Sequence, residues 1–525
     1  MSSRVAAPGR SLGSSLRSLR SLRSLTRARG AAHPALTLTV IVTCQLMLIL
    51  DASVVNIALP QIQRDLGISA TDGSWMLSAY MLTFGGLLLL GGRVGDIFGR
   101  RVTFIGGLAL FTVSSLLAGL ATSAAMLIAL RAIQGIGAAF AAPSALALLT
   151  ITFAEGEPRN RALSIFGAAA SAGGSIGTLL GGALTALASW RWVFFINVPI
   201  GLVVIVVAWL IVAEPERNPG RLDLLGALLV TTGMAALVYG FIRAASDGWG
   251  DPLSWGAFIA AVALLGLFLY TETRVRQPIM PLRLFADRNR LGAYVNILLV
   301  PATMFGVFFF VAQFLQTVLG MSPLVAGLAF LPMTLTMFAT VRLLPRLLPV
   351  IGAKRMAVAS AALLVVGIIW LAQLSASSNY LTGILGPSLV LGLGMGSANL
   401  PLSVIILSGV PRGDSGIASG ALQTMQQVGA SLGVAILVTI FGVTSRAAAA
   451  HPAPHLSALA QGRAVFVAGV QSAFRWDVLF PLAALALTIV VIQEARGARA
   501  RSDEADKSAD DAPGEPEREP FVEVA

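Results

Sequence analysis

Two charged side chains are embedded in stretches of sequence that are otherwise apolar. Asp51 lies in "LDASVVNIALP", the end of an apolar run that starts near residue 35, and Arg131 begins "RAIQGIGAAFAAPSA". At a helical rise of about 1.5 Å per residue, Asp51 lies roughly 12 Å from the outer end of its apolar run, and Arg131 lies roughly 10 Å from the outer end of its run. A charge at mid-membrane costs at least about 2.5 to 3.5 kcal/mol, so each is expected to face protein, water or the other charge. An acid beside a base can then change its protonation as solvent access changes.

Two other interpretations of these charges remain open. The first is a static ion pair that only holds two helices together. The second is direct contact between Asp51 and a cationic substrate, which is compatible with protonation and could compete with it.

The elements that carry these charges are predicted to be membrane-spanning helices. Only 12% of the 525 residues are charged and 56% are hydrophobic, whereas soluble proteins carry about a quarter charged residues. Crossing the hydrocarbon takes about 20 apolar residues. Fourteen such stretches are predicted, which makes the chain an all-α integral membrane protein. They span residues 36–59, 74–93, 102–121, 124–150, 162–188, 192–213, 222–242, 254–271, 291–318, 323–348, 356–374, 380–408, 416–444 and 474–494.

Loop charges and linkers predict the topology and the domains. Most of the 36 Lys and Arg fall in loops on one side of a fourteen-span chain, which places both termini in the cytoplasm. The net charge of +11 is therefore a topology signal rather than evidence for nucleic acid. The residues 445–473 are expected to form an outer loop. The predicted parts are a basic disordered tail (1–35), a six-helix bundle (36–213), two linker helices with a cytoplasmic loop (214–290), a second six-helix bundle (291–497) and an acidic disordered tail (498–525).

Several chemistries are excluded by what the sequence lacks. The only lysines, Lys354 and Lys507, do not lie in a Gly-Lys-Ser/Thr loop, so an ATP-driven pump is not expected. His33, His451 and His455 lie outside every predicted span, which leaves no histidine metal site or catalytic triad in the membrane. We therefore expect no enzyme and no cofactor. Vectorial work would have to draw on an ion gradient.

Glycine-rich segments indicate close helix contacts and a tight turn. The run "GAAASAGGSIGTLLGGAL" is expected to pack closely against other helices, because each Gly costs up to about 1 kcal/mol of helix propensity. Generic tight packing without a role in coupling is the alternative. In "GGRVGDIFGRR" the glycines permit a sharp turn, with Asp96 as a helix cap and Arg100 and Arg101 in the cytosol. In "PRGDSGIASG", Asp414 or Ser415 is expected to cap the next helix.

Polar amides beside Phe and Met suggest an adaptable cavity for amphipathic molecules. Each amide could instead make a simple bond between helices. The candidate cavity residues are Gln134, Phe309, Gln313, Gln316, Asn399, Gln423 and Gln426.

With these motifs in place, the chain resembles the major facilitator superfamily, and within it the fourteen-span drug:proton antiporter family. "LDASVVNIALPQI", "GGRVGDIFGRR", "RAIQGIGAA" and "WRWVFFINVPIG" are similar to four family motifs in the same order. The resemblance implies a major facilitator fold with helices grouped as 6 + 2 + 6. It also implies that Asp51 is a proton or cation site and that Arg131 assists proton movement.

The resemblance assigns two further sets of residues. The first is a cytoplasmic gate that meets the start of span thirteen, formed by Gly92, Asp96, Gly99, Arg100, Arg101 and Asp414. The second is the antiporter-motif packing surface of span five, formed by Gly173, Gly177, Gly181 and Gly182. Two positions depart from the family pattern: Thr178 follows Gly177 where the motif normally has Pro, and Ile97 stands where a basic residue is frequent.

The sequence therefore predicts a proton-coupled exporter of hydrophobic or cationic compounds in the inner (cytoplasmic) membrane. Its expected partners are an amphipathic or cationic small molecule, protons and membrane lipid, and no nucleic acid. The first alternative is a proton-coupled importer or metabolite carrier on the same fold. The second is a receptor or assembly factor that does not transport.

Overall fold

The computed structural model describes residues 34–154, 156–214, 222–275, 278–410, 414–451 and 457–493. Within these ranges the chain is helical and contains no strand. The elements are α2 (Pro34–Leu66), α3 (Ala70–Phe98), α4 (Arg100–Gly119), α5 (Ala124–Thr152), α6 (Glu157–Leu187), α7 (Trp192–Phe195), α8 (Asn197–Ile211), α9 (Leu224–Asp247), α10 (Pro252–Arg274), η1 (Leu282–Phe285), α11 (Arg288–Thr317), α12 (Pro323–Ala329), α13 (Leu331–Ile351), α14 (Ala353–Leu371), η2 (Tyr380–Leu385), α15 (Gly386–Leu407), α16 (Ser415–Ala449), α17 (Ala458–Asp477) and α18 (Leu479–Val490).

Fourteen segments among the described residues are long and apolar enough to cross a membrane, which confirms the predicted number. Helices satisfy their own backbone hydrogen bonds, which is the condition for crossing lipid. Three spans contain a local break, where α7 meets α8, α12 meets α13 and α17 meets α18. The predicted tails 1–35 and 498–525 lie outside the described residues, apart from Pro34 and Ala35, which begin α2.

One predicted loop is wrong. Residues 445–473 were expected to connect two spans outside the membrane, but α16 continues to Ala449 and α17 begins at Ala458. The last span therefore runs from Ala458 to Val490 rather than over 474–494. Gln461 and Arg463 lower the hydropathy of its first turns, so an apolar-run criterion does not detect them.

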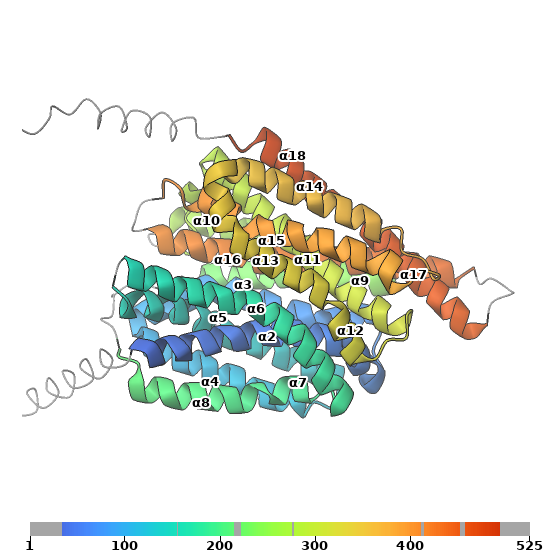
Figure 1. The fold of residues 1–525 in the computed structure, drawn as a ribbon, viewed down its shortest axis with the longest axis horizontal. Helices are drawn as coiled ribbons and strands as arrows, with labels where there is room; N and C mark the ends of the chain where they lie inside the picture. Colours follow the sequence, from blue (N-terminus) through green and yellow to red (C-terminus); the bar gives the residue numbers. More distant parts are fainter. Residues whose placement is uncertain are drawn as a thin grey trace, which may run out of the picture.

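The helices form two halves that lie against each other (Figure 1). In the first half α3 and α4 pack on α5, and α2 packs on α6. In the second half α11 packs on α16, and α15 packs on α13 and α14. The helices α9 and α10 pack on each other, and α9 also contacts α3 and α16, one from each half. This arrangement is consistent with the 6 + 2 + 6 plan, with the extra pair placed beside the α3–α16 contact.

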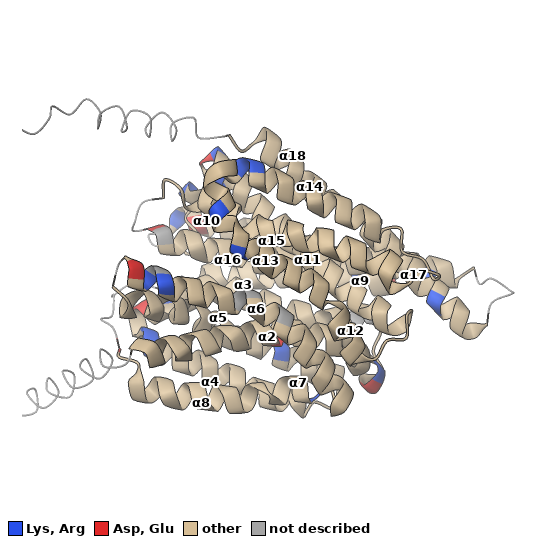
Figure 2. Cartoon of the chain, viewed as in Figure 1, with Lys and Arg blue, Asp and Glu red and all other residues tan. Residues whose placement is uncertain are grey.

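The charged residues that the structure describes lie mostly toward the helix ends, and the helix bodies contain few of them (Figure 2). We name the two ends of the bundle after α2: the Pro34 end, where this helix begins, and the Leu66 end, where it finishes.

Glycines of α6 bring that helix into direct contact with α2. A Cβ added at Gly173 would lie 2.9 Å from Ile49, and one at Gly181 would lie 2.9 Å from the carbonyl oxygen of Val54. Between them, Gly177 faces Ser53. The glycines thus recur one turn apart along one face, where only a hydrogen atom fits between the helices.

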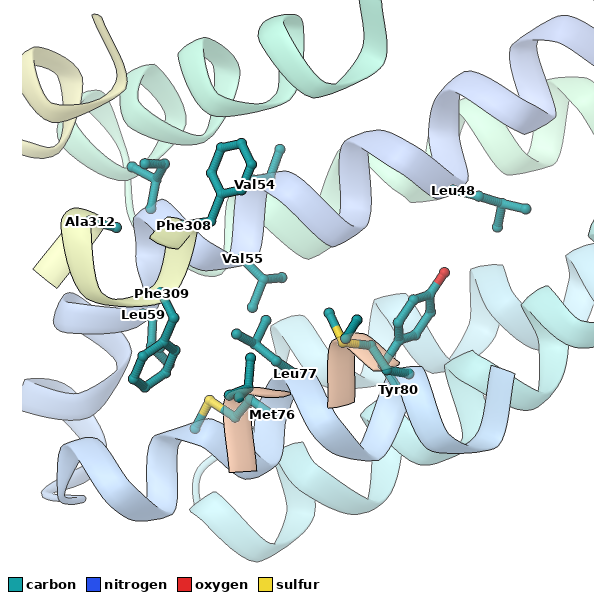
Figure 3. Close-up of a cluster of buried hydrophobic side chains, with 14 of the residues drawn as sticks. Leu48, Val54, Val55, Leu59, Met76, Leu77, Tyr80, Phe308, Phe309 and Ala312 are labelled. Carbon is teal, nitrogen blue, oxygen red and sulfur yellow. The ribbon is translucent and has the colours of Figure 1, made fainter. Parts of the chain in front are cut away.

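The two halves meet along α3 and α16, and a second group of contacts between them lies near the Leu66 end. Gly182 of α6 approaches the backbone of Pro323 in α12, and an added Cβ there would lie 2.5 Å from its carbonyl oxygen. Nearby, Gln316 Nε2 of α11 donates to the carbonyl oxygen of Ile57 in α2 at 3.0 Å. Buried side chains of both halves join in one apolar cluster at this contact, with Phe309 of α11 close to α2 (Figure 3). The helix α2 therefore touches its own half on one face and the other half on another.

The contact between α2 and α6 yields a test of this packing. Replacing Gly181 by Leu should lower the free energy of unfolding by about 1–3 kcal/mol, because backbone atoms of Val54 occupy the space and cannot rotate away. Gly174→Leu, in the same helix, is the matched control, since nothing lies within 4 Å of its added Cβ. The thermal unfolding midpoint of the purified protein in detergent measures both. Equal midpoints for the two variants would contradict the packing described here.

Candidate functional site: a buried ion pair between four helices

The centre of the first half holds an ion pair that is closed off from solvent. Arg131 Nη1 of α5 donates to Asp51 Oδ2 of α2 at 2.5 Å, and their side chains are 1% and 0% exposed. The two residues are 80 positions apart in the chain, yet they meet because they lie at the same depth in neighbouring helices. Their equal depths could be predicted from the sequence, and the structure shows the direct contact.

Two amides complete the coordination of the carboxylate. Gln134 Nε2 donates to Asp51 Oδ1 at 2.8 Å, and Asn197 Nδ2 at the start of α8 donates to the same oxygen at 2.9 Å. Both amides also donate to Ser115 Oγ of α4, at 2.5 Å and 3.2 Å. The carboxylate of Asp51 therefore accepts from three N–H donors, one of them the guanidinium of Arg131.

The guanidinium of Arg131 is positioned by three kinds of contact besides the carboxylate. Its Nε donates to the carbonyl oxygen of Met76 in α3 at 3.1 Å, and Nη1 also donates to Gln134 Oε1 at 2.7 Å. Its carbon Cζ lies 4.3 Å from the centre of the Tyr80 ring, a cation–π distance. Its Nη2 has no hydrogen-bond partner among the described residues. Asp51 thus balances the charge of Arg131, while Nη2 of the guanidinium is left without a hydrogen bond among the described residues.

Small residues make this close approach possible. Gly135 follows Gln134 in α5, and a Cβ there would lie 2.4 Å from the carbonyl oxygen of Tyr80 in α3. Gly137 likewise lies against the backbone of Phe111 in α4. The run "QGIGAA" therefore sets α5 directly against both neighbours and places Arg131 and Gln134 where α2, α4 and α8 converge.

Three members of this network were not anticipated. Asn197 and Ser115 were not singled out, and Tyr80 carries no charge that would attract notice. Asn197 lies within "WRWVFFINVPIG", and a lone amide in an apolar run is the signal that could have identified it. Gln134 was expected to line the substrate cavity, but in this conformation its amide bonds only to Asp51, Arg131 and Ser115.

The predicted gate residues separate into two groups at the Pro34 end. Arg100 Nη2 donates to Asp96 Oδ1 at 2.5 Å, and its Nη1 donates to the carbonyl oxygen of Gly92 at 2.9 Å. Asp414, at the start of α16, instead accepts from Arg283 of η1 at 2.8 Å. Among the described residues, no hydrogen bond or ion pair joins Asp414 to Asp96 or Arg100.

The expected helix cap at Asp96 is wrong, and the one at Asp414 is correct in position only. Asp96 does not cap a helix, because α3 extends to Phe98 and Gly99 alone makes the turn, with a φ of 118°. Glycine is the residue that adopts this conformation without strain. Asp414 occupies the N-cap position of α16, but its side chain makes no capping hydrogen bond. Arg101 turns away from the gate to the carbonyl oxygen of Trp209, at the end of α8.

The remaining cavity candidates do not form one group. Phe309 and Gln313 are buried in α11, where Gln313 bonds back to the Phe309 carbonyl, and Gln316 bonds to α2 as described above. Asn399 of α15 accepts from Gln426 Nε2 of α16 at 2.7 Å, and the bond is exposed. Gln423 lies one turn before that bond and is partly exposed. Asn399 is thus the exposed member of this set.

Known proteins are similar to this chain in sequence and in fold. The family model described as Major Facilitator Superfamily matches residues 41–434. The cephamycin export protein CmcT of Amycolatopsis lactamdurans is 39% identical over 460 residues, which cover 85% of this chain and 95% of that protein. The puromycin resistance protein pur8 of Streptomyces alboniger is 39% identical over 465 residues, with 86% and 90% covered.

Solved structures show the fold. A bacterial homolog of the human lysosomal transporter Spinster, in an inward-facing and unoccupied conformation, superposes with a TM-score of 0.62 at 17% identity. The match covers 88% of this chain and 97% of that chain. At this identity the likeness supports the helix arrangement alone.

The buried ion pair should contribute to the stability of the protein. Asp51→Asn should lower the free energy of unfolding by about 3–5 kcal/mol, because it leaves the buried Arg131 without a counter-charge. Replacing both residues, Asp51→Asn with Arg131→Gln, should cost less than the sum of the two single changes. The control is Asp247→Asn, which breaks an exposed pair with Arg243 and should have little effect. Chemical unfolding in mixed micelles measures all four variants, and an Asp51 effect no larger than that of Asp247 would refute the assignment.

Proposed function

The chain belongs to the Major Facilitator Superfamily, a family of membrane transporters, and we propose that it exports antibiotic-like amphipathic or cationic compounds in exchange for protons. The observation that carries the proposal is the buried Asp51–Arg131 pair, in which a carboxylate and its partner are enclosed by four helices. Relatives named for cephamycin export, puromycin resistance and lincomycin resistance support drug export as the direction and the class of substrate.

Protonation of Asp51 would change the packing of α2. The anion accepts three hydrogen bonds from α5 and α8, and a proton on either oxygen would remove the charge that orients Arg131 and the amides. The cation would retain Gln134 Oε1, the Met76 carbonyl and the Tyr80 ring. Protonation thus weakens the attachment of α2 to α5 without removing every partner of Arg131.

The loosened helix also contacts the second half. Ile57 follows Asp51 by less than two turns, and its carbonyl accepts from Gln316. The α6 glycines hold α2 on its other side. A shift of α2 that follows protonation would therefore reach the inter-half contact at the Leu66 end. This is the connection that alternating access requires, in which a local charge change biases two arrangements of packed bundles.

The polarity of transport follows from the sidedness of the chain. We place the Pro34 end in the cytoplasm, because Arg100, Arg101, Arg290 and Lys354 lie there, and the positive-inside rule assigns such an end to the cytoplasm. In the cytoplasmic membrane of a bacterium, protons would then enter from the Leu66 end while substrate leaves in the opposite direction.

The proposed exchange is tested with inside-out membrane vesicles and a fluorescent cationic dye such as ethidium. Acidifying the vesicle lumen should drive dye accumulation by the wild type, and Asp51→Asn should abolish it. The control is Asp65→Asn, the same change near the end of α2, where the exposed carboxylate accepts from Trp190 Nε1 and an amide oxygen can still accept. Accumulation by Asp51→Asn at the wild-type rate would exclude proton coupling through this residue. Dye movement only out of the vesicles would favour import.

The Asn399–Gln426 pair is proposed as part of the substrate cavity. Gln426→Ala should change the relative resistance of expressing cells to different compounds by several-fold, because it removes a polar contact without touching the ion pair. Gln373→Ala is the control, since that exposed amide, just beyond α14, donates only to a carbonyl at the end of α14. Growth inhibition across a panel of antibiotics and dyes is the measurement. A uniform loss of resistance to every compound would place Gln426 outside substrate selection.

A further inference from the structure

A second buried carboxylate lies in the other half of the molecule. Asp477 is the last residue of α17, and Val478 separates this helix from α18. The two helices together form the span Ala458–Val490. Asp477 lies thirteen residues before the end of that span, or about 20 Å along a helix, and so deep within it.

The side chain of Asp477 has few partners. It is 0% exposed, and its Oδ1 accepts one hydrogen bond, from Thr303 Oγ1 of α11 at 3.0 Å. Its Oδ2 has no partner among the described residues and lies 3.9 Å from where a Cβ at Gly306 would stand. Asp51, by contrast, accepts from three donors, one of them a cation.

No described cation compensates this carboxylate. The elements packed against α17 are α11, α14, α16 and α18. Their titratable or charged residues, with those of α17 itself, are Arg288, Arg290, Tyr294, Lys354, Arg355, Arg446, Arg463 and Arg475, and α18 has none. None of them forms an ion pair or hydrogen bond with Asp477. Several bond elsewhere, as Tyr294 does to the Ala418 carbonyl and Lys354 to the Ile489 carbonyl.

The surroundings therefore favour the neutral acid. An ionised carboxylate that is buried without a counter-charge is strongly disfavoured, and such a group takes up a proton instead. One hydroxyl donor does not replace the hydration that the anion loses. The two buried carboxyls thus differ in their surroundings, because Asp51 has a cation and two amides as partners and Asp477 has one hydroxyl.

A break in the helix lies beside this carboxyl. Pro481 has no N–H to donate to the carbonyl oxygen of Asp477, four residues earlier, so the regular bonding of the helix is interrupted there. Interrupted membrane helices frequently form ion sites in transporters, because their backbone can shift and line a cavity. The break supplies the means by which water could reach Asp477 in a second conformation.

We propose that Asp477 is a second proton-binding site, in the second half, which holds its proton in this conformation and releases it to water in the other. The step breaks the carboxyl O–H bond, transfers the proton to a water molecule and leaves the carboxylate. Its part in coupling rests on the function proposed above. The protonated state itself does not depend on that function.

Infrared spectroscopy of the purified full-length chain tests the protonated state without substrate. The wild type should show the C=O stretching band of a protonated carboxyl, which Asp477→Asn should remove, whereas Asp51→Asn should leave it in place. Thr303→Val should shift the band, because it removes the hydroxyl that bonds to Oδ1. Thr488→Val, which removes a buried hydroxyl that bonds to Asn296, is the control and should leave the band unchanged. A spectrum of Asp477→Asn identical to that of the wild type would overturn the proposal.

Proton counting in proteoliposomes tests the role in coupling. Asp477→Asn should transport ethidium with one proton fewer per dye than the wild type, while Asp51→Asn should lose coupled transport altogether. An unchanged ratio in Asp477→Asn would overturn the coupling role and leave a static neutral acid. If the wild type moves no protons with the dye, the exchange function fails, and the infrared result still decides whether Asp477 carries a proton.

Discussion

The arrangement of the first half depends on the cost of placing a carboxylate and a guanidinium inside a membrane protein. Neither charge is stable there alone, and together they are stable only because the amides of Gln134 and Asn197, the Met76 carbonyl and the Tyr80 ring complete their coordination. These hydrogen bonds can form only where α2, α3, α5 and α8 meet. Glycine contacts between α3, α4 and α5 allow the approach, so close packing in this half serves the ion pair.

The same requirement explains how a proton could move helices. A buried polar site is stable when each of its charged and polar groups has a partner. When one charge is neutralised, the groups that it oriented have to find new partners. Because Asp51 lies on α2, and α2 contacts both α6 and the second half, such a rearrangement is not confined to the ion pair. The helices α9 and α10 add a second constraint. The helix α9 packs against both α3 and α16, and so covers the contact between these two helices. If one half moved against the other, α3 or α16 would have to slide along α9.

Much of the fold could be predicted from hydropathy, and the errors have physical causes. Fourteen spans follow from the length of apolar runs, since each must cross the same thickness of hydrocarbon. The first turns of α17 were missed because Gln461 and Arg463 interrupt the apolar pattern. That error also concealed Asp477, which a span over 474–494 would place near the membrane surface, whereas the span from Ala458 places it deep inside.

The candidate site was partly predictable for a similar reason. Charges in apolar runs are conspicuous, and equal depth predicts that Asp51 and Arg131 can meet. Asn197 and Ser115 were missed because their contribution depends on which helices are neighbours, and hydropathy carries no information about neighbours. The separation of Asp414 from Asp96 and Arg100 depends on the conformation of the molecule, and the gate motif alone does not specify a conformation.

The central claim is that Asp51 exchanges a proton as substrate binds and leaves, and proton release from the purified protein tests it most directly. Ethidium added to the protein in a weakly buffered solution should release protons from the wild type when the starting pH is low enough to protonate Asp51, and this release should disappear at a starting pH at which Asp51 is already ionised. Asp51→Asn should release fewer protons than the wild type at the low starting pH. If that variant binds the dye and releases as many protons as the wild type, the ion pair is a structural link and the proton is carried elsewhere.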